Sequence, residues 1–223
     1  KWAFEWLYRV WQNGSDVIAP DGSTVSGYLD SPESIAAITF LRDLVTEYGV
    51  SPEPTVYDQL IQQAGFLDRF LLGEFAMFDR GHWELVGLRA NANYQEGSFG
   101  ILSQPASAQE ATVFYASGFV VNASLTDAEK QAACDFIAAA TDRGYQDTKA
   151  ITGIAISGNQ AAAEAAAQDN PYPEIEEVFV NEVQFGRPPY GARFANWPTV
   201  EELLDAMMER ILAGGDVETE VAA

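Results

Sequence analysis

The chain has 223 residues and is 48% hydrophobic, a composition that excludes a disordered protein and predicts a folded core in one or two domains. Its formal net charge of -21 excludes nucleic acid and anionic membrane surfaces as partners, because both would repel it. The sequence has one cysteine and one histidine. It therefore cannot form a disulfide framework, and it has no cluster of cysteine and histidine ligands for a metal ion.

The first predicted elements are a helix, a hairpin and a second helix. Aromatic and aliphatic residues recur at helical spacing up to Trp11, and turn residues follow. A second cluster of turn residues predicts a small hairpin over residues 17–29. Ser31, followed by proline and glutamate, is typical of a helix start. The apolar stripe after it predicts a helix that ends at Gly49 in a left-handed cap.

The next elements form a helix, a buried strand and a turn. Residues 55–72 predict an amphipathic helix, which Gly73 ends. The short apolar run 75–78 is typical of a strand buried on both faces. Gly81 then permits a sharp turn, and Trp83 stands at the start of a further helical pattern. Such a junction of strand, turn and helix is where open α/β sheets bind ligands.

Two strands and a capped helix are predicted in the middle of the chain. Residues 99–102 predict a short strand. Residues 112–121 predict a longer one, in which Gly118 marks a bulge or a close approach of another group. A capping box that begins at Thr126 starts a helix reaching about Ala140.

The C-terminal third is predicted to be mainly helical. An Ala-rich segment ending near Gln168 and residues 174–185 both follow helical patterns. A second capping box, at Thr199, predicts the start of the last long helix, which ends at Gly214. Helices outweigh strands and alternate with them along the chain, so the predicted fold class is α/β.

Motifs for catalysis are absent from the sequence, which contains no Gly-x-Ser-x-Gly, Walker A or Gly-x-Gly-x-x-Gly motif. His82 is the only histidine, and a lone histidine beside a tryptophan is more often a packed or capping residue than a catalytic base. With 33 acidic residues, carboxylate pairs such as Asp79 and Glu84 are expected by chance. The sequence therefore predicts no catalytic residue, no metal and no cofactor.

Aromatic residues beside turns give the stronger functional indication. The chain has five tryptophans and nine tyrosines, and Trp83, Tyr115 and Trp197 each lie beside a glycine or proline turn. A sugar has one apolar C–H face that fits a flat ring, and aromatic contact contributes about 0.5–1.5 kcal/mol beyond the burial of area. Filling of the core is the competing interpretation for Trp83 and Trp197.

Eight short segments occur in an order that carries a family resemblance. They are residues 12–18, 30–33, 40–45, 73–77, 81–83, 99–105, 117–122 and 214–215. Together they resemble the later half of a family 1 extracellular solute-binding protein, the receptor subunit of ABC importers. Each segment alone is weak, but the ordered set covers almost the whole chain and is fairly specific for this family.

The resemblance implies the two-lobed periplasmic-binding-protein (type II) fold, in which ligand lies in a cleft between lobes joined by a hinge. The chain would form the C-terminal lobe, with the N-terminal lobe largely missing, and would be a piece of a longer protein. Residues 1–110 and 169–223 would build the C-terminal lobe. Residues 111–168 would comprise the hinge crossing and a segment that belongs to the N-terminal lobe.

The resemblance also implies which residues contact the ligand. Trp83 and Trp197 fall where aromatic residues of the C-terminal lobe stack on sugar rings. Tyr115 and Gly118 fall where the chain crosses between the lobes, near the ligand. Phe4 falls where an aromatic residue lines the cleft.

The implied function is capture of a small-molecule carbohydrate for an ABC importer, without chemistry of its own. Ligand that contacts both lobes favours the closed state, which docks on the permease subunits. Glu201, one turn past Trp197, is a candidate acceptor for sugar hydroxyls, with a solvated first-turn carboxylate as the competing interpretation. The family carries other solutes too, so the ligand itself stays open. The protein is expected outside the cytoplasm, in the periplasm or lipid-anchored at the outer face of the cell membrane.

Residues 119–165 carry a separate expectation. Without the N-terminal lobe, this segment would expose a strand edge and an apolar helix stripe. We therefore expect the chain to self-associate through these residues or to pack them in a different way.

Two other functions remain open on the sequence. An acidic α/β glycoside-processing enzyme would need two carboxylates in a cleft, about 5–9.5 Å apart. A plain interaction domain would bury its aromatic residues, so the exposure of Trp83 and Trp197 separates it from a receptor.

Overall fold

The computed structural model describes residues 5–62 and 65–223 and divides the chain into two compact units. Unit 1 comprises Lys1–Phe66, Gln104–Tyr115 and Phe185–Ala223, and unit 2 comprises Leu67–Ser103 and Ala116–Gln184. The boundaries of these two units differ from the lobe boundaries predicted from the sequence. The assignment of residues 1–110 and 169–223 to the C-terminal lobe, and of 111–168 to the hinge crossing and the N-terminal lobe, stays a prediction.

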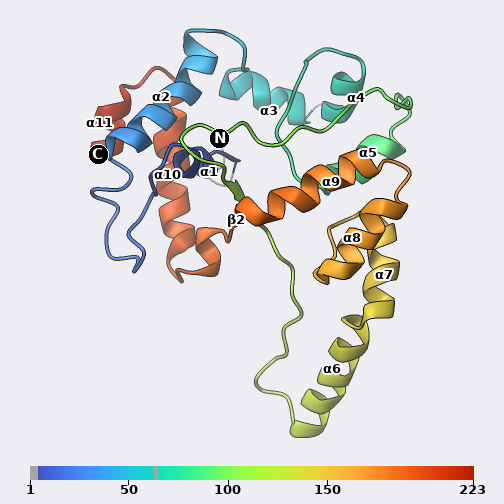
Figure 1. Ribbon diagram of the computed structural model, residues 1–223. Helices are drawn as coiled ribbons and strands as arrows, with labels where there is room; N and C mark the ends of the chain where they lie inside the picture. Colours follow the sequence, from blue (N-terminus) through green and yellow to red (C-terminus); the bar gives the residue numbers. More distant parts are fainter. Residues whose placement is uncertain (1–4, 63–64) are drawn as a thin grey trace. The chain divides into compact units, whose positions relative to one another are not determined.

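Unit 1 contains helices and one short pair of strands, of which β2 is labelled in Figure 1. Its helices are α1 (Leu7–Gln12), α2 (Pro32–Thr46), α3 (Pro54–Gln62), α10 (Trp197–Leu212) and α11 (Val217–Ala222), with the 3₁₀ helix η3 (Tyr190–Ala192). Strands β1 (Thr112–Val113) and β2 (Gly186–Arg187) pair in parallel, with Thr112 opposite Gly186 and Val113 opposite Arg187.

The core of unit 1 forms where α1, α2, α10 and α11 pack together. Val10, Ile38 and Ile211 are completely buried there, and burying a side chain of this size stabilises the fold by about 1.5–3 kcal/mol. The predicted start of α2 is confirmed, because the Ser31 side chain accepts a hydrogen bond from the Ser34 N–H and proline opens the helix. Packing therefore fixes the position of α1 and α10, the two helices that flank the site described below.

Hydrogen bonds connect α1 to the segment that leads into β1. The side-chain nitrogen Nε2 of Gln12 donates to the Ala111 carbonyl at 2.8 Å. In return, Gln109 Nε2 donates to the Trp11 carbonyl at 2.6 Å. The first bond gives the buried Gln12 amide a partner in the interior, and the two bonds together hold β1 beside α1.

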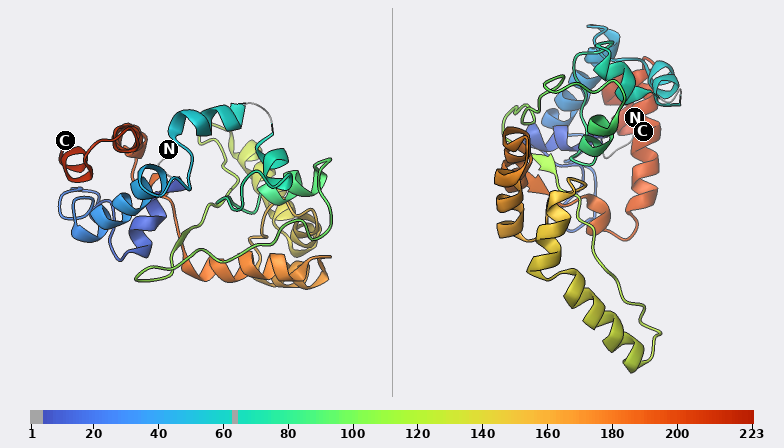
Figure 2. Two further views of the ribbon diagram at one scale, coloured as in Figure 1. Left: turned by 90° about the horizontal axis from the view of Figure 1, so that it is seen from above. Right: turned by 90° about the vertical axis from the view of Figure 1, so that its right-hand side faces the viewer.

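Unit 2 is helical in the residues that the structure describes. Its helices are α4 (Phe66–Leu71), which begins at the unit boundary, α5 (Glu84–Ala90), α6 (Asp127–Ala140), α7 (Arg143–Ile151), α8 (Gln160–Asp169) and α9 (Pro173–Glu182), followed by the 3₁₀ helix η2 (Val183–Phe185). Helix α8 packs against both α7 and α9, and its buried alanines allow close approach. Figures 1 and 2 show α6 extending away from these three helices.

Helix α6 confirms the predicted capping box. The Thr126 hydroxyl accepts a hydrogen bond from the Glu129 N–H at 3.4 Å, and the Glu129 carboxylate accepts one from the Thr126 N–H at 2.9 Å. The helix ends at Ala140, as predicted.

Three predicted strands are wrong in whole or in part. Residues 75–78 and 99–102 form no strand, and residues 112–121 form one only over Thr112–Val113. A strand needs a hydrogen-bonded neighbour, and an apolar run by itself does not provide one.

The aromatic residues of the 75–78 run pack against each other and against a neighbouring helix. Phe75 and Phe78 form a cluster with Phe70 of α4, with ring centroids between 4.7 and 6.2 Å apart. The apolar run therefore serves packing within unit 2 without joining a sheet.

Three further predictions differ from the structure in their boundaries. Residues 17–29 form turns and no paired strands, and residues 55–72 contain two helices, α3 and α4, in place of one. Helix α10 begins at Trp197 and not at the predicted capping box of Thr199. Pro198 fits this earlier start, because a proline in the first helical turn has no N–H that needs a partner.

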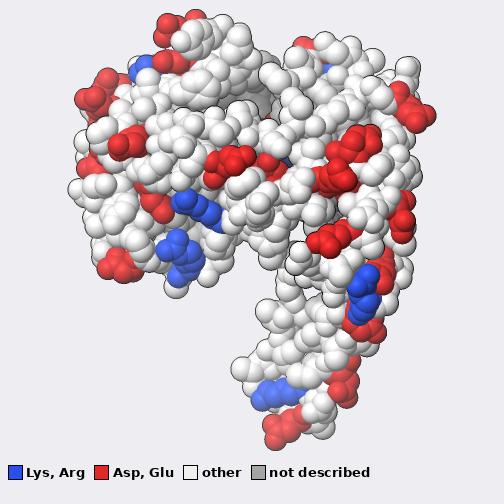
Figure 3. Space-filling view, in the orientation of Figure 1, with Lys and Arg blue, Asp and Glu red and all other residues white. Residues whose placement is uncertain are grey.

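Acidic side chains are spread over the surface. Figure 3 shows Asp and Glu scattered across the visible face, with few Lys and Arg among them. In the described part of the chain, no helix is both long and apolar enough to cross a bilayer.

Candidate functional site

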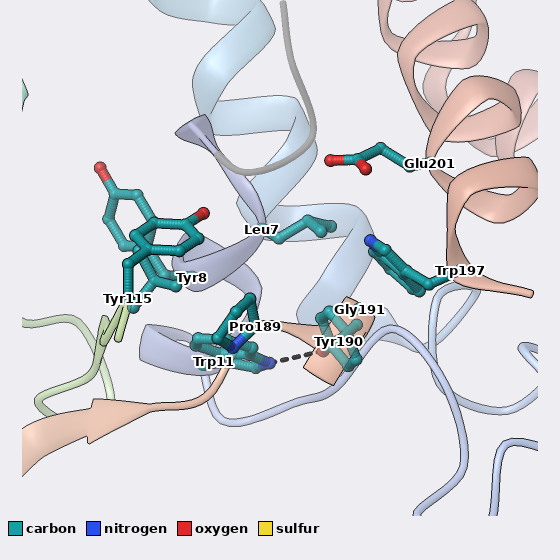
Figure 4. A pocket seen from close by; sticks show the side chains of 10 residues that line it. Leu7, Tyr8, Trp11, Tyr115, Pro189, Tyr190, Gly191, Trp197 and Glu201 are labelled. Carbon is teal, nitrogen blue, oxygen red and sulfur yellow. Dashed lines mark hydrogen bonds between the residues drawn. The ribbon is translucent and has the colours of Figure 1, made fainter. Parts of the chain in front are cut away.

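A pocket of about 190 Å³ opens in unit 1 where α1, β1, η3 and α10 meet. Five aromatic side chains line it, together with Leu7, Val113, Pro189, Gly191 and Glu201; the aromatic residues are Tyr8, Trp11, Tyr115, Tyr190 and Trp197. In Figure 4, Tyr8 and Tyr115 lie on one side of the pocket, and Trp197 and Glu201 lie on the other. Apolar walls with a few polar groups suit a small ligand that has both kinds of surface.

A buried hydrogen-bond network fixes two of the aromatic walls. The indole Nε1 of Trp11 donates to the Tyr190 hydroxyl at 2.6 Å, and that hydroxyl donates to a carboxylate oxygen of Asp16. Burial raises the pKa of Tyr190 far above its ordinary value, and the hydrogen bond to Asp16 raises it further. Tyr190 therefore keeps its proton and holds the two rings in one arrangement.

The chain places Tyr190 and Trp197 against each other. Pro189 holds an extended backbone before the short η3 turn that presents Tyr190. The indole of Trp197 stacks on the Tyr190 ring, with centroids 4.5 Å apart and an interplanar angle of 23°. A Cβ at Gly191 would lie 3.3 Å from Cδ1 of Trp197, so a glycine there allows this tight packing.

Trp197 belongs to the core and also forms a wall of the pocket. Only 5% of the residue is exposed, and it lies in the same buried cluster as Val10 and Ile211. Its first-turn neighbour Glu201 lines the pocket too. Trp197 therefore fills the core and lines the pocket at the same time. Its stacking on a ligand stays a prediction.

Two of the predicted site residues, Trp83 and Gly118, do not line this pocket. Trp83 lies in unit 2 directly before α5 and is 49% exposed. A Cβ at Gly81 would come within 2.0 Å of the Trp83 ring, so the indole lies directly over this glycine. Gly118 is exposed, and nothing would lie within 4 Å of a Cβ there, which leaves the predicted bulge or close approach without support. Phe4 lies outside the described residues.

Glu201 and Tyr115 form the polar part of the pocket. Partial burial raises the pKa of Glu201, and the charge of Asp205 adds to the effect. Burial also raises the pKa of Tyr115 to about 12, with further contributions from the charges of Glu201 and Glu5. In both groups burial is the first cause of the raised pKa, because it disfavours the charged form.

Two arginines contact the aromatic residues of the pocket. The guanidinium carbon of Arg9 lies 4.7 Å from the centroid of the Tyr8 ring, and that of Arg187 lies 5.5 Å from the Trp11 ring. Neither arginine is among the described residues that line the pocket. Glu201 is the only charged side chain among those described lining residues.

A second buried polar cluster lies in unit 2 and joins α9 to α5 and the residues before it. His82 Nε2 lies 2.7 Å from Glu176 Oε2, and the Phe179 ring meets the imidazole edge-on at 4.9 Å. Arg89 Nη1 lies 3.6 Å from the other carboxylate oxygen. The interpretation of His82 as a packed residue is confirmed, since it is buried and paired with Glu176.

The electrostatics of this cluster stabilise an ionised carboxylate. Burial alone would raise the pKa of Glu176, but the hydrogen bond with His82 and the charges of His82 and Arg89 outweigh it. The net effect is a pKa below the ordinary glutamate value. Within residues 5–62 and 65–223, no three potential metal ligands come together, here or elsewhere.

Comparison with known proteins identifies the family. Residues 2–174 match the family model described as bacterial extracellular solute-binding protein. The chain belongs to this family. No curated protein matches the sequence of this solute-binding protein significantly.

Two solved structures share the fold of this solute-binding protein. An ABC substrate-binding protein from Listeria monocytogenes, in complex with cycloalternan, is 22% identical with a TM-score of 0.80. Maltose-bound MalE3 from T. maritima is also 22% identical, with a TM-score of 0.74. Each match covers 99% of this chain but 54% and 55% of the other, so the chain spans about half the length of these structures.

Several predictions are thereby confirmed. The family is that of solute-binding proteins, and the fold class is an α/β part of the two-lobed periplasmic-binding-protein fold. The family consists of binding proteins and not of enzymes, and its description places its members outside the cytoplasm.

Sequence reasoning found three of the ten described residues that line the pocket: Tyr115, Trp197 and Glu201. It missed Tyr8, Trp11 and Tyr190. Tyr190 follows two prolines and precedes a glycine, the same turn context that singled out the other aromatic residues. The contact between Tyr190 and Trp11 joins parts of the chain that are distant in sequence, so no local sequence pattern predicts it.

Proposed function

We propose that this solute-binding protein is the receptor of an ABC importer for a sugar or oligosaccharide, and that the unit 1 pocket holds one sugar ring. The observation that supports this most directly is the set of five aromatic walls with one carboxylate. Both solved relatives carry a saccharide, cycloalternan in one and maltose in the other, which favours the same class of ligand here.

The chemistry of the pocket suits a sugar ring. Flat aromatic rings complement the C–H face of a pyranose, and the Glu201 carboxylate accepts hydrogen bonds from hydroxyl groups. The Tyr8 hydroxyl is buried and has no hydrogen-bond partner among the described residues, so it offers a further donor or acceptor to a ligand. A buried hydroxyl left without a partner is costly, and a bound sugar would relieve that cost.

The proposed mechanism is capture by domain closure. In the full-length protein, ligand contacts to both lobes favour the closed state, and the closed state engages the permease subunits. Trp83, Gly118 and Phe4 stay predicted ligand contacts in this scheme. We further propose that the protein works in the periplasm or lipid-anchored at the outer face of the cell membrane.

Titration of tryptophan fluorescence with maltose tests the pocket. Replacing Tyr115 by alanine should weaken binding by about 2- to 10-fold, because the variant loses one aromatic contact of about 0.5–1.5 kcal/mol. Tyr48→Ala is the matched control, since Tyr48 is exposed in unit 1 and does not line the pocket. Equal affinity in the Tyr115 variant and the wild type would place the sugar elsewhere.

We also propose that the chain self-associates through residues 119–165. Val120 is 94% exposed, and the exposed Phe119 and Phe136 pack against each other with ring centroids 5.8 Å apart. Together they form an apolar surface of the kind that marks an interaction site.

Sedimentation velocity tests this proposal. The wild type should show concentration-dependent association, and Val120→Asp should shift it to monomer because a charge would be buried at the contact. Leu102→Asp, at another exposed apolar residue of unit 2, should leave the association unchanged. A wild type that stays monomeric at all concentrations would contradict the proposal.

A further inference from the structure

The size of the pocket limits what it can hold. Its volume of about 190 Å³ is smaller than the roughly 300–1,000 Å³ of pockets that enclose a drug-sized ligand. The pocket is therefore too small to enclose a whole oligosaccharide. The remaining rings of a longer ligand would lie outside these walls.

The charge of the pocket limits the ligand further. Glu201 is the only charged side chain among the described lining residues, and its carboxylate points from α10 toward the pocket in Figure 4. Behind the Trp11 and Tyr190 walls lies a second carboxylate, that of Asp16. Burial raises the pKa of the Tyr115 hydroxyl, which lies across the pocket from Glu201 in Figure 4, and the charges of Glu201 and Glu5 add to the effect.

Two arginines near the pocket contact its aromatic residues without lining it. The guanidinium groups of Arg9 and Arg187 lie over the rings of Tyr8 and Trp11, and neither arginine lines the pocket. A carboxylate or phosphate on a ligand binds most strongly to charged donors, which arginine supplies best. The described lining residues offer only neutral donors, such as the hydroxyls of Tyr8 and Tyr115, and their one charged group is Glu201, which as a carboxylate only accepts hydrogen bonds.

We propose that this pocket selects an uncharged sugar ring and rejects rings that carry a carboxylate or a phosphate, with Glu201 as the residue that discriminates. The inference rests on the proposed sugar-binding function and adds the substrate class. A neutral ring donates its hydroxyl protons to Glu201, while an acidic ring brings a second negative charge to the same wall.

A matched pair of ligands tests the inference. Methyl α-D-glucopyranoside and methyl α-D-glucuronopyranoside differ only in the group at C6, which is CH₂OH in one and carboxylate in the other. Binding to the wild type is measured by calorimetry or ligand-observed NMR at low salt. We expect the glucuronide to bind at least about tenfold more weakly than the glucoside, with a smaller difference at high salt because ions screen the repulsion.

Variants of α10 assign the effect to one residue. Glu201→Gln removes the charge and keeps the shape of the side chain. It should therefore abolish most of the difference in affinity between the glucoside and the glucuronide. Glu202→Gln changes the same net charge at the exposed neighbouring position and should keep the preference. Retained discrimination in Glu201→Gln would overturn the role of this residue.

The outcomes separate the two proposals. If both sugars bind the wild type equally, charge selection is wrong while sugar binding in the pocket stands. If neither sugar binds, the sugar-binding function of the pocket fails, and the selectivity fails with it. Binding of the glucuronide alone would reverse the proposed selectivity.

Discussion

Replacing Trp197 by alanine should lower the free energy of unfolding of unit 1 by about 3–5 kcal/mol, the usual cost of removing a buried tryptophan. The residue is 5% exposed, and its indole stacks on Tyr190 at 4.5 Å. Its loss would leave a cavity beside Tyr190 and remove one wall of the pocket. Chemical denaturation followed by circular dichroism measures the effect.

Trp83→Ala is the matched control for this substitution. Trp83 is also a tryptophan at a helix start, but it is 49% exposed. Its removal should cost no more than about 1 kcal/mol, because much of the indole already contacts water. If the two variants lost equal stability, the assignment of Trp197 to the core would be wrong.

Replacing Glu176 by alanine should destabilise unit 2 by about 3–5 kcal/mol. The substitution leaves the buried His82 without the carboxylate that lies 2.7 Å from its Nε2, and it removes the anion beside Arg89. A partner left unpaired in the interior is the main part of this cost. Hydrogen exchange of α5 and α9 amides should accelerate in the variant.

Neighbouring residues and pH provide the controls. Glu177→Ala, one position along α9 and exposed, should change stability by less than about 0.5 kcal/mol. Because folding lowers the pKa of Glu176, its ionised form contributes stability fully above the ordinary glutamate value of about 4.3. This contribution is lost as pH falls through the lower folded-state pKa, so wild type and Glu176→Ala should converge in acid. A gap that persists at pH 2 would contradict the ionic origin of the effect.

Local capping chemistry explains which helices could be predicted from the sequence. The starts of α2 at Ser31 and of α6 at Thr126 depend on residues within one turn, so the sequence carries all of the information. Helix α7 also begins with a capping residue, Asp142, and shows that such a start is missed when no apolar stripe follows.

Strands were harder to predict, because pairing joins segments that are distant in sequence. Residues 75–78 have the composition of a buried strand, yet no strand lies beside them in the described chain. Conversely, Gly186–Arg187 has no strand pattern of its own and pairs because it lies next to Thr112–Val113. Whether a segment forms a strand therefore depends on a pairing partner that is distant in the sequence.

The same reasoning applies to the pocket. Tyr115 and Trp197 stand beside turns in the sequence, and the family resemblance places both near the ligand, with Glu201 one turn past Trp197. The contact between Trp11 and Tyr190 could not be predicted, because it depends on the fold bringing α1 to η3 and on Asp16 accepting the second hydrogen bond.

The interleaving of the two units has a consequence for synthesis on the ribosome. Helix α1 leaves the ribosome before unit 2, but its partners η3 and α10 belong to Phe185–Ala223 and leave it after unit 2. All of unit 2 is translated before then, so it can fold while the aromatic side chains of α1 still lack their cover. A nascent chain stalled before residue 185 would expose Trp11, the kind of surface that chaperones bind.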